Sequence, residues 1–265
     1  MTTGLQSGVE VGELRRLSHT QVQMFLRCPR QYEFRYLRGL KSPPGAALIK
    51  GKAYDFVCNM NYTEKIKTGK DAKDGMDFVP EGWRAAMDEA GGEVDWGSKN
   101  ITQVAGELND HARLFFAEIA PKVDPVAVQV EVRREGFLAY IDVVDSDTRI
   151  RDNKAKSKLM GVNEPFKDLQ PTAYAYAMDT SIDFIFDVTT PHKAGMYATQ
   201  RDMADVAAYA RLLDDVRAAI SAGTFPCNPT NNFCSPNWCG YWERCDHGGT
   251  RWFTPAKEDA LIFTG

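Results

Sequence analysis

Apolar residues change their spacing near residue 125, and this change divides the chain into a helical part and a strand-rich part. Before it, apolar positions recur every three to four residues, which is the spacing of a helix that buries one face. After it, the valines between 126 and 132 alternate with other residues, which is the period of a β-strand. The first part predicts helices over 19–38, 47–62, 80–91 and 99–119, with a polar surface loop over 63–78.

The second part predicts a sheet covered by helices. Strands are expected over 126–134, 137–145, 148–154 and 182–188, and helices over 170–178 and 200–221. Pro171 fits only in the first turn of its helix, because proline has no N–H to donate. We therefore expect an α/β fold with a mixed central sheet. It would form one domain over 1–265, with a helical region (18–120), a core (126–222) and a cysteine-rich tail (223–265).

Composition and charge restrict the class of protein. The 265 residues are 43% hydrophobic and 26% charged, as in an ordinary globular protein, and the net charge of −4 argues against a sequence-independent coat for nucleic acid. No apolar run approaches the ~20 residues that span a bilayer, and the N-terminus lacks the features of a signal peptide. We expect a cytoplasmic protein without a membrane partner. Basic residues nevertheless crowd the predicted strands, at Arg133, Arg134, Arg149, Arg151, Lys154, Lys156 and Lys158.

Two carboxylates and a lysine are the strongest chemical signal in the strands. Asp142 lies inside an apolar strand, and a buried carboxylate needs a partner. Asp152 and Lys154 follow on the next strand, where residues two apart share a face of the sheet. Two carboxylates and an ammonium group on one face suit a hard divalent cation and a phosphate ester.

The cysteines indicate a second metal site. Four of the six, Cys227, Cys234, Cys239 and Cys245, fall within nineteen residues that are rich in Pro, Gly and aromatic residues. The C-x4-C-x5-C spacing of the last three suits a metal centre that takes its fourth ligand from Cys227 or, from far away, Cys28. Four thiolates serve zinc and iron–sulfur clusters equally well, so the spacing leaves both open.

An ordered set of motifs resembles a known family. The set is Ser18…Cys28-Pro29…Tyr32, Gly51-Lys52-Ala53-Tyr54-Asp55, Tyr140-Ile141-Asp142, Asp152-Asn153-Lys154, Gln170-x3-Tyr174 and the closing cysteines. It is similar to the PD-(D/E)xK nuclease superfamily, most of all to the RecB-like branch with an iron–sulfur cluster. That branch includes the CRISPR-associated single-strand exonucleases, the AddB nuclease domain and virus-encoded relatives. The resemblance implies a restriction-endonuclease-like sheet.

The resemblance also implies a role for each motif residue. Asp142 and Asp152 would bind Mg²⁺ or Mn²⁺, together with Asp55 and the backbone carbonyl of Asn153. Lys154 would polarise the attacking water, and Gln170 and Tyr174 would lie near the DNA strand. The ligands of a [4Fe–4S] cluster would be Cys28, Cys234, Cys239 and Cys245.

The chain departs from the family pattern at three places. Asp55 stands where the family usually has His, the C-x4-C spacing is two residues longer than the usual C-x2-C, and Ala139 replaces a common glycine. The longer spacing leaves Cys227 as an alternative cluster ligand.

The expected function is a metal-dependent deoxyribonuclease, an exonuclease on single-stranded DNA, in recombination, repair or replication. If the protein is virus-encoded, it would work in the cytoplasm of a bacterial host. A homo-oligomer or a recombination partner protein stays open. The alternatives are a catalytically weakened DNA-binding protein of the same fold and a zinc-stapled interaction module.

Overall fold

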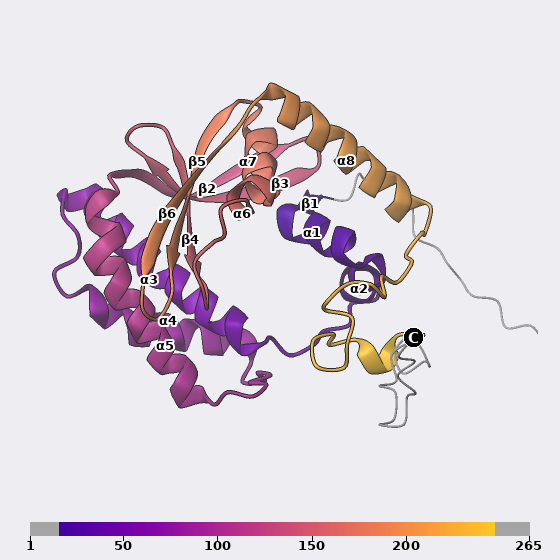
Figure 1. The fold of residues 1–265 in the computed structure, drawn as a ribbon, viewed down its shortest axis with the longest axis horizontal. Helices are drawn as coiled ribbons and strands as arrows, with labels where there is room; N and C mark the ends of the chain where they lie inside the picture. Colours follow the sequence, from indigo (N-terminus) through magenta and orange to yellow (C-terminus); the bar gives the residue numbers. More distant parts are fainter. Residues whose placement is uncertain (1–15, 247–265) are drawn as a thin grey trace, which may run out of the picture.

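The computed structural model describes residues 16–246, and its centre is a mixed six-stranded sheet with helices on both sides (Figure 1). The strand order is β1-β3-β4-β5-β6, and β2 pairs with β3. The bounds are β1 (Leu17–Ser18), β2 (Pro125–Arg134), β3 (Phe137–Asp145), β4 (Ile150–Ala155), β5 (Ile182–Thr189) and β6 (Ala194–Arg201). The expected α/β fold with a mixed, helix-flanked sheet is confirmed.

One edge of β3 is shared by two strands, and this arrangement places the carboxylates. β1 pairs in parallel with the start of β3, while β4 pairs antiparallel with its end, through Val143 with Arg151 and Val144 with Ile150. Extending that register by one residue sets Asp142 opposite Asp152. β4 then pairs in parallel with β5 along its whole length, so it is an inner strand of the sheet.

The N-terminal helical stretch is broken where one continuous helix was expected. Ser18 caps α1 (His19–Arg27) in a capping box with Gln21. Cys28 has an extended backbone, with φ −162°, and Pro29 opens the short helix α2 (Pro29–Tyr32), which continues as a π-helical turn, η1 (Glu33–Leu37). The prediction of a helix over 19–38 was therefore wrong at Cys28, because a residue before proline avoids the helical region.

Three longer helices follow, and the expected loop over 63–78 is partly helical. α3 (Ala46–Thr68) runs six residues past its predicted end and stops at Gly69, whose left-handed φ of 75° suits a helix C-terminus. A 3₁₀ turn, η2 (Gly75–Asp77), leads into α4 (Phe78–Ala90). α5 (Ile101–Leu114) continues through η3 (Phe115–Ile119) and η4 (Ala120–Lys122) to the sheet.

The second half contains one strand that sequence patterning missed. α6 (Glu164–Lys167) and α7 (Gln170–Met178) lie between β4 and β5. β6 is antiparallel to β5 over its full length, where a loop and the start of a helix were expected. α8 (Met203–Ser221) therefore begins at residue 203 rather than 200, and its N-cap is Asp202.

Two hydrophobic cores lie on the two sides of the sheet. One joins the sheet to α1, α7 and α8 through Phe184, Phe186 and Tyr209, and the other joins it to α3 and α5 through Tyr54 and Leu108. Figure 1 shows α7 and α8 on one side and α3, α4 and α5 on the other. None of the helices among the described residues is long and apolar enough to cross a bilayer.

The last described segment, 223–246, has a single short 3₁₀ turn, η5 (Trp242–Arg244), and folds back onto the start of the chain. The side chains of Asn228 and Asn231 donate to the carbonyl of Arg27 at 3.0 and 2.8 Å. The hydroxyl of Tyr241 donates to the carbonyl of Leu40 at 3.1 Å. These bonds bring the closing cysteines to Cys28.

Candidate functional site

Two hydrogen bonds and one ion pair connect Asp152, Lys154 and Gln170 in a closed set between β4 and α7. The Lys154 ammonium lies 2.7 Å from Asp152 Oδ2 and donates to Gln170 Oε1 at 2.8 Å. The Gln170 amide in turn donates to Asp152 Oδ1 at 2.6 Å and to the Tyr174 hydroxyl at 2.9 Å. Gln170 and Tyr174 are one helical turn apart, so they share a face of α7. The structure thus brings together four residues singled out from the sequence.

Asp142 and Asp55 bring two more carboxylates to the same place. Burial, then the carboxylates of Asp152 and Asp55, raise the pKa of Asp142 to about 9. Burial and the charge of Asp152 also raise the pKa of Asp55, to about 6. Neighbouring carboxylates repel one another, so without an added cation Asp142 keeps its proton at neutral pH, whereas Asp55 is mostly ionised there.

The lysine and the tyrosine keep their protons in this surrounding. Burial by itself lowers the pKa of Lys154, but the charges of Asp152 and Asp142 overcome it and raise the pKa above its usual range. Burial and the carboxylate of Asp142 raise the pKa of Tyr174 well above its usual range. Lys154 is therefore a fixed positive charge, and Tyr174 is a neutral hydroxyl.

The donor set suits a hard cation, but its side chains are not arranged as a finished metal shell. Asp55 Oδ1 is buried without a hydrogen-bond partner, and carboxylate oxygens are the ligands that Mg²⁺ prefers. Within residues 16–246, however, no group of three or more His, Cys, Asp or Glu side chains is placed to hold a metal ion. Gln170 donates to Asp152 Oδ1, whereas Asp152 Oδ2 lies 2.7 Å from the Lys154 ammonium but has no hydrogen-bond partner, so a metal at Asp152 would share this carboxylate with Lys154 and Gln170.

Asn153 contributes no side chain to this set. It alternates with Asp152 and Lys154 along β4, so its side chain points to the other side of the sheet. There it is buried, and neither polar atom of its amide has a hydrogen-bond partner in the described chain. The predicted contribution of Asn153, through its backbone carbonyl, stays a prediction.

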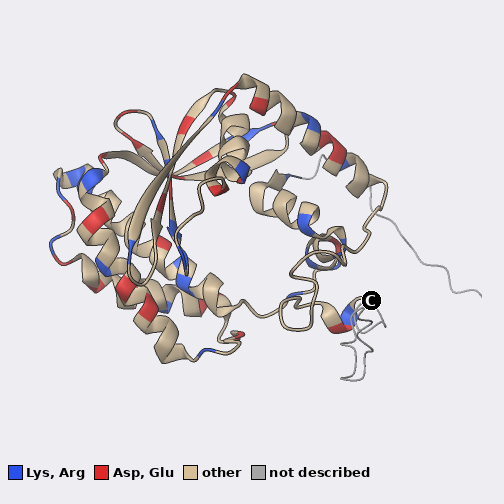
Figure 2. Cartoon of the chain, viewed as in Figure 1, with Lys and Arg blue, Asp and Glu red and all other residues tan. Residues whose placement is uncertain are grey.

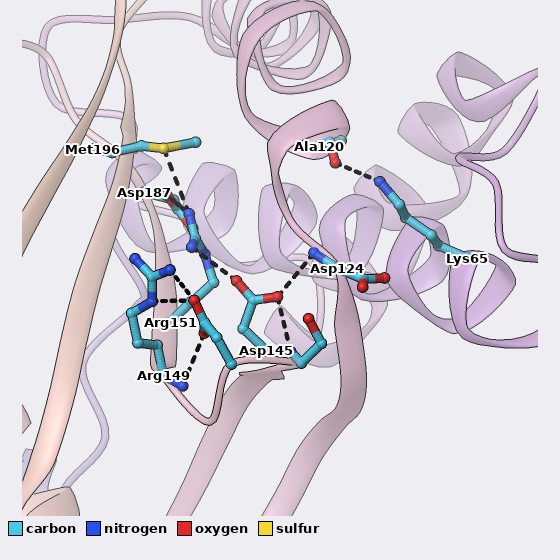
Figure 3. Close-up of polar contacts among 10 residues, drawn as sticks. Lys65, Ala120, Asp124, Asp145, Arg149, Arg151, Asp187 and Met196 are labelled. Carbon is cyan, nitrogen blue, oxygen red and sulfur yellow. Dashed lines mark hydrogen bonds and ion pairs between the residues drawn. The ribbon is translucent and has the colours of Figure 1, made fainter.

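A buried ion-pair network behind the site holds β4 in place (Figure 3). Arg151 directly precedes Asp152 and is 3% exposed. Its guanidinium contacts both oxygens of Asp187 on β5, at 2.8 and 2.9 Å, and Asp145 Oδ2 on β3 at 3.0 Å. Arg151 therefore fixes β4 to both of its neighbours at the position next to Asp152.

His19 and Asp168 lie next to the site, although sequence reasoning gave neither of them a role. Burial lowers the pKa of His19 to about 4, and Asp168, Lys154 and Asp152 are the charged groups that act on it. Asp168 Oδ1 accepts a hydrogen bond from the backbone N–H of Gln170 at 2.9 Å. His19 is the first residue of α1, and no motif or spacing in the sequence links it to β4.

The basic residues on the strands are largely neutralised, so they do not form the positive patch that their number suggested. Figure 2 shows Asp and Glu interspersed with Lys and Arg over the sheet and its connections. Each of the seven except Lys158 forms an ion pair with a nearby carboxylate. Lys158 is exposed and forms no ion pair with any described residue.

The cysteines form a second candidate site. Cys28, Cys227, Cys234, Cys239 and Cys245 line one pocket, and all six cysteines of the chain are free thiols. Burial and the neighbouring Cys239 raise the pKa of Cys234 to about 11. The Gln31 amide donates to Cys239 Sγ at 3.2 Å, which is a contact that would also suit a metal-bound thiolate. Cys58 lies elsewhere, buried on α3.

Comparison with known proteins places this geometry in a family. The family model of the PD-(D/E)XK nuclease superfamily matches residues 16–246. No curated protein shows significant sequence similarity.

Two solved structures are similar to the chain. One, described as a "putative exonuclease" from Eubacterium rectale, is 12% identical with a TM-score of 0.51, over 88% of this chain and 93% of that one. The other, SSO0001, is 14% identical over 86% of this chain and 98% of that one, but its TM-score of 0.36 is too low to indicate a shared fold. The family match covers most of the chain, and the first of these structures shares its fold. The chain belongs to the PD-(D/E)XK nuclease superfamily.

Proposed function

We propose that this protein is a metal-dependent deoxyribonuclease that works as an exonuclease on single-stranded DNA. The observation that carries the proposal is the closed set of Asp152, Lys154 and Gln170, with the carboxylates of Asp142 and Asp55 beside it. Membership of the nuclease superfamily supports phosphodiester hydrolysis.

In the proposed reaction, the role of each residue follows from its charge. Asp142 and Asp152, with Asp55, would hold Mg²⁺ or Mn²⁺, which when bound polarises the phosphoryl oxygen and activates a water. Lys154, held as a cation by Asp152, stabilises the negative charge that develops on the phosphate in the transition state. Gln170 orients Lys154 and Asp152 at the same time, and Tyr174 orients Gln170.

A cleavage assay with oligonucleotides labelled at the 5′ or the 3′ end tests this proposal. The wild type should degrade single strands with Mg²⁺ or Mn²⁺, and Asp152→Ala and Lys154→Ala should each slow cleavage by roughly 10²–10³-fold. Asp183→Ala is the matched control, since Asp183 is an exposed strand carboxylate on β5. Degradation that starts at only one end of the strand would support an exonuclease and would give its direction. No metal-dependent cleavage by the wild type would contradict the proposal.

The alternative of a catalytically weakened DNA-binding protein is favoured by one observation. The described residues include no group of three or more His, Cys, Asp or Glu side chains placed to hold a metal ion, and the Lys154 ammonium lies 2.7 Å from Asp152 Oδ2. In that case the wild type would bind DNA and leave it intact with either metal.

The cysteine pocket supports a second part of the proposal, a structural [4Fe–4S] cluster. Cys28, Cys234, Cys239 and Cys245 are the proposed ligands, with Cys227 as the alternative in the same pocket. The cluster would join the closing segment to the junction between α1 and α2. Iron with acid-labile sulfide in the purified protein would support it, zinc without iron would favour a zinc staple, and neither metal would contradict both.

A further inference from the structure

The connection 156–169, between β4 and α7, begins and ends at the candidate site. Lys154 precedes it and Gln170 follows it, and these two side chains are hydrogen-bonded at 2.8 Å. Whatever occupies the site therefore lies beside this connection. Neither its apolar nor its basic residues have a part in the chemistry described above.

The connection is held in a fixed shape. The buried guanidinium of Arg201 donates to the carbonyls of Pro165, Phe166 and Asp168 at 3.1, 3.2 and 3.0 Å. Met160 is buried in the core beside α7, and Lys156 pairs with Glu164 across the connection. A segment with this many attachments presents its outward side chains in defined positions.

Two of those outward side chains are large and apolar. Val162 is 85% exposed and Phe166 is 63% exposed, and among the described residues only Trp238 lies in the same range. Scattered apolar residues on a surface need no explanation, but here two of them lie on one fixed connection beside a candidate active site. Their exposure adds nothing to the folded state, so an interaction with a partner is the better explanation.

Charge identifies the kind of partner. Lys158 and Lys167 are exposed on the same connection, and neither forms an ion pair within the described residues. Apolar side chains flanked by unpaired cations match a polymer that offers flat apolar faces and a negative backbone, which is a single-stranded nucleic acid. In a duplex the base faces are stacked and hidden, so the bases here must be unpaired.

We propose that the connection 156–169 binds unpaired DNA bases at the nuclease site, with Phe166 and Val162 against the bases and Lys158 and Lys167 at the phosphates. This inference rests on the proposed function, because the site supplies the reason for DNA to be there. It gives the preference for single strands a physical origin in this chain.

Binding of two labelled strands tests the inference. One is an oligothymidine, and the other is an abasic strand of equal length, which has the phosphates but no bases. Both are measured by fluorescence polarisation with Ca²⁺, so that binding is read without cleavage. Phe166→Ala should weaken binding of oligothymidine about tenfold and leave the abasic strand unchanged, since stacking on one base contributes roughly 1–3 kcal/mol.

Two control variants separate the contributions. Ile101→Ala removes an apolar side chain that is 48% exposed on α5, and it should change neither dissociation constant. Lys158→Gln should weaken the binding of both strands to the same extent and make binding less sensitive to salt. All three side chains are exposed, so the melting temperature should stay the same.

The outcomes distinguish the inference from the proposed function. If Phe166→Ala loses the same binding affinity for both strands, or loses none for either, the proposed role of the connection is overturned even if the wild type cleaves DNA. A wild type that never cleaves, but binds oligothymidine through Phe166, would overturn the proposed function and keep the inference.

Discussion

The two candidate sites are built in opposite ways. The carboxylate site takes its side chains from α3, β3, β4 and α7, and hydrogen bonds within the protein already connect several of them. The cysteine pocket takes Cys28 from a break between two helices and its other thiols from a segment whose only regular element is η5. The first site is positioned by the sheet, whereas the second depends on side-chain contacts between distant loops.

This difference indicates what an added metal does at each site. At the carboxylates, a cation would bind among side chains that the sheet already positions, and it would relieve the repulsion that raises the pKa of Asp142 and Asp55. At the cysteines, a bound metal would supply the order that secondary structure does not, so its binding energy would contribute to folding. The three predictions below test this contrast.

The largest expected effect is on the buried ion pairs that hold β4 behind the carboxylate site. Arg151→Ala leaves Asp145 and Asp187 buried without their partner, which costs about 3–5 kcal/mol of unfolding free energy. Urea denaturation followed by circular dichroism measures it.

The matched control is two residues away on the same stretch of chain. Arg149 pairs with Asp147, but its side chain is 46% exposed, so Arg149→Ala should cost no more than about 1 kcal/mol. Similar losses of unfolding free energy in the two variants would mean that the buried network does not hold β4. The contrast between a carboxylate site positioned by the sheet and a cysteine pocket without such support would then fail.

The next effect concerns the cysteine pocket. Cys28→Ser should lower the bound iron several-fold and expose 223–246 to proteolysis, with a loss of about 3 kcal/mol if the cluster acts like other long-range cross-links. Cys58→Ser is the control, because Cys58 is buried on α3 outside the pocket, and it should leave the iron content unchanged. Iron content that does not differ between the two variants would argue against the pocket as the metal site.

Local patterns predicted most of the elements that carry the carboxylate site. The strand over 137–145 and the helix over 170–178 were predicted with their observed bounds, the strand from its apolar residues and the turns beside it, and the helix from Pro171 in its first turn. β6 was missed because its sequence, AGMYATQR, has no clear alternation of apolar and polar residues. Its strand character comes from pairing with β5, which single-sequence periodicity cannot show.

The sequence predicted the residues of the carboxylate site better than the contacts between them. The motifs indicated Asp152, Lys154 and Gln170, but the amide that bonds Asp152 comes from a helix eighteen residues away in the chain. His19 could not be found at all, because its place beside Lys154 results from the packing of α1 against the sheet. The sequence likewise suggested a basic surface on the strands, where the structure forms ion pairs.

The smallest of the three effects is a pH dependence of stability, which the carboxylate site should show and the cysteine pocket should not. The pKa of Asp142 is raised from 3.8 to about 9 by burial and by Asp152 and Asp55, so folding opposes its ionisation. For a raised pKa, stability is full below the unfolded value and falls as the pH rises toward the folded value. In metal-free protein, Asp142→Asn should therefore become more stable than the wild type as the pH rises from about 4 to about 9. The gain should be largest at the upper end of this range and should appear as a rise in Tm of several degrees. Mg²⁺ should reduce the gap, since it stabilises the ionised form of Asp142, which the variant lacks. A gap that is independent of pH would show that Asp142 is not held among repelling carboxylates, and the site would then need no cation to complete it.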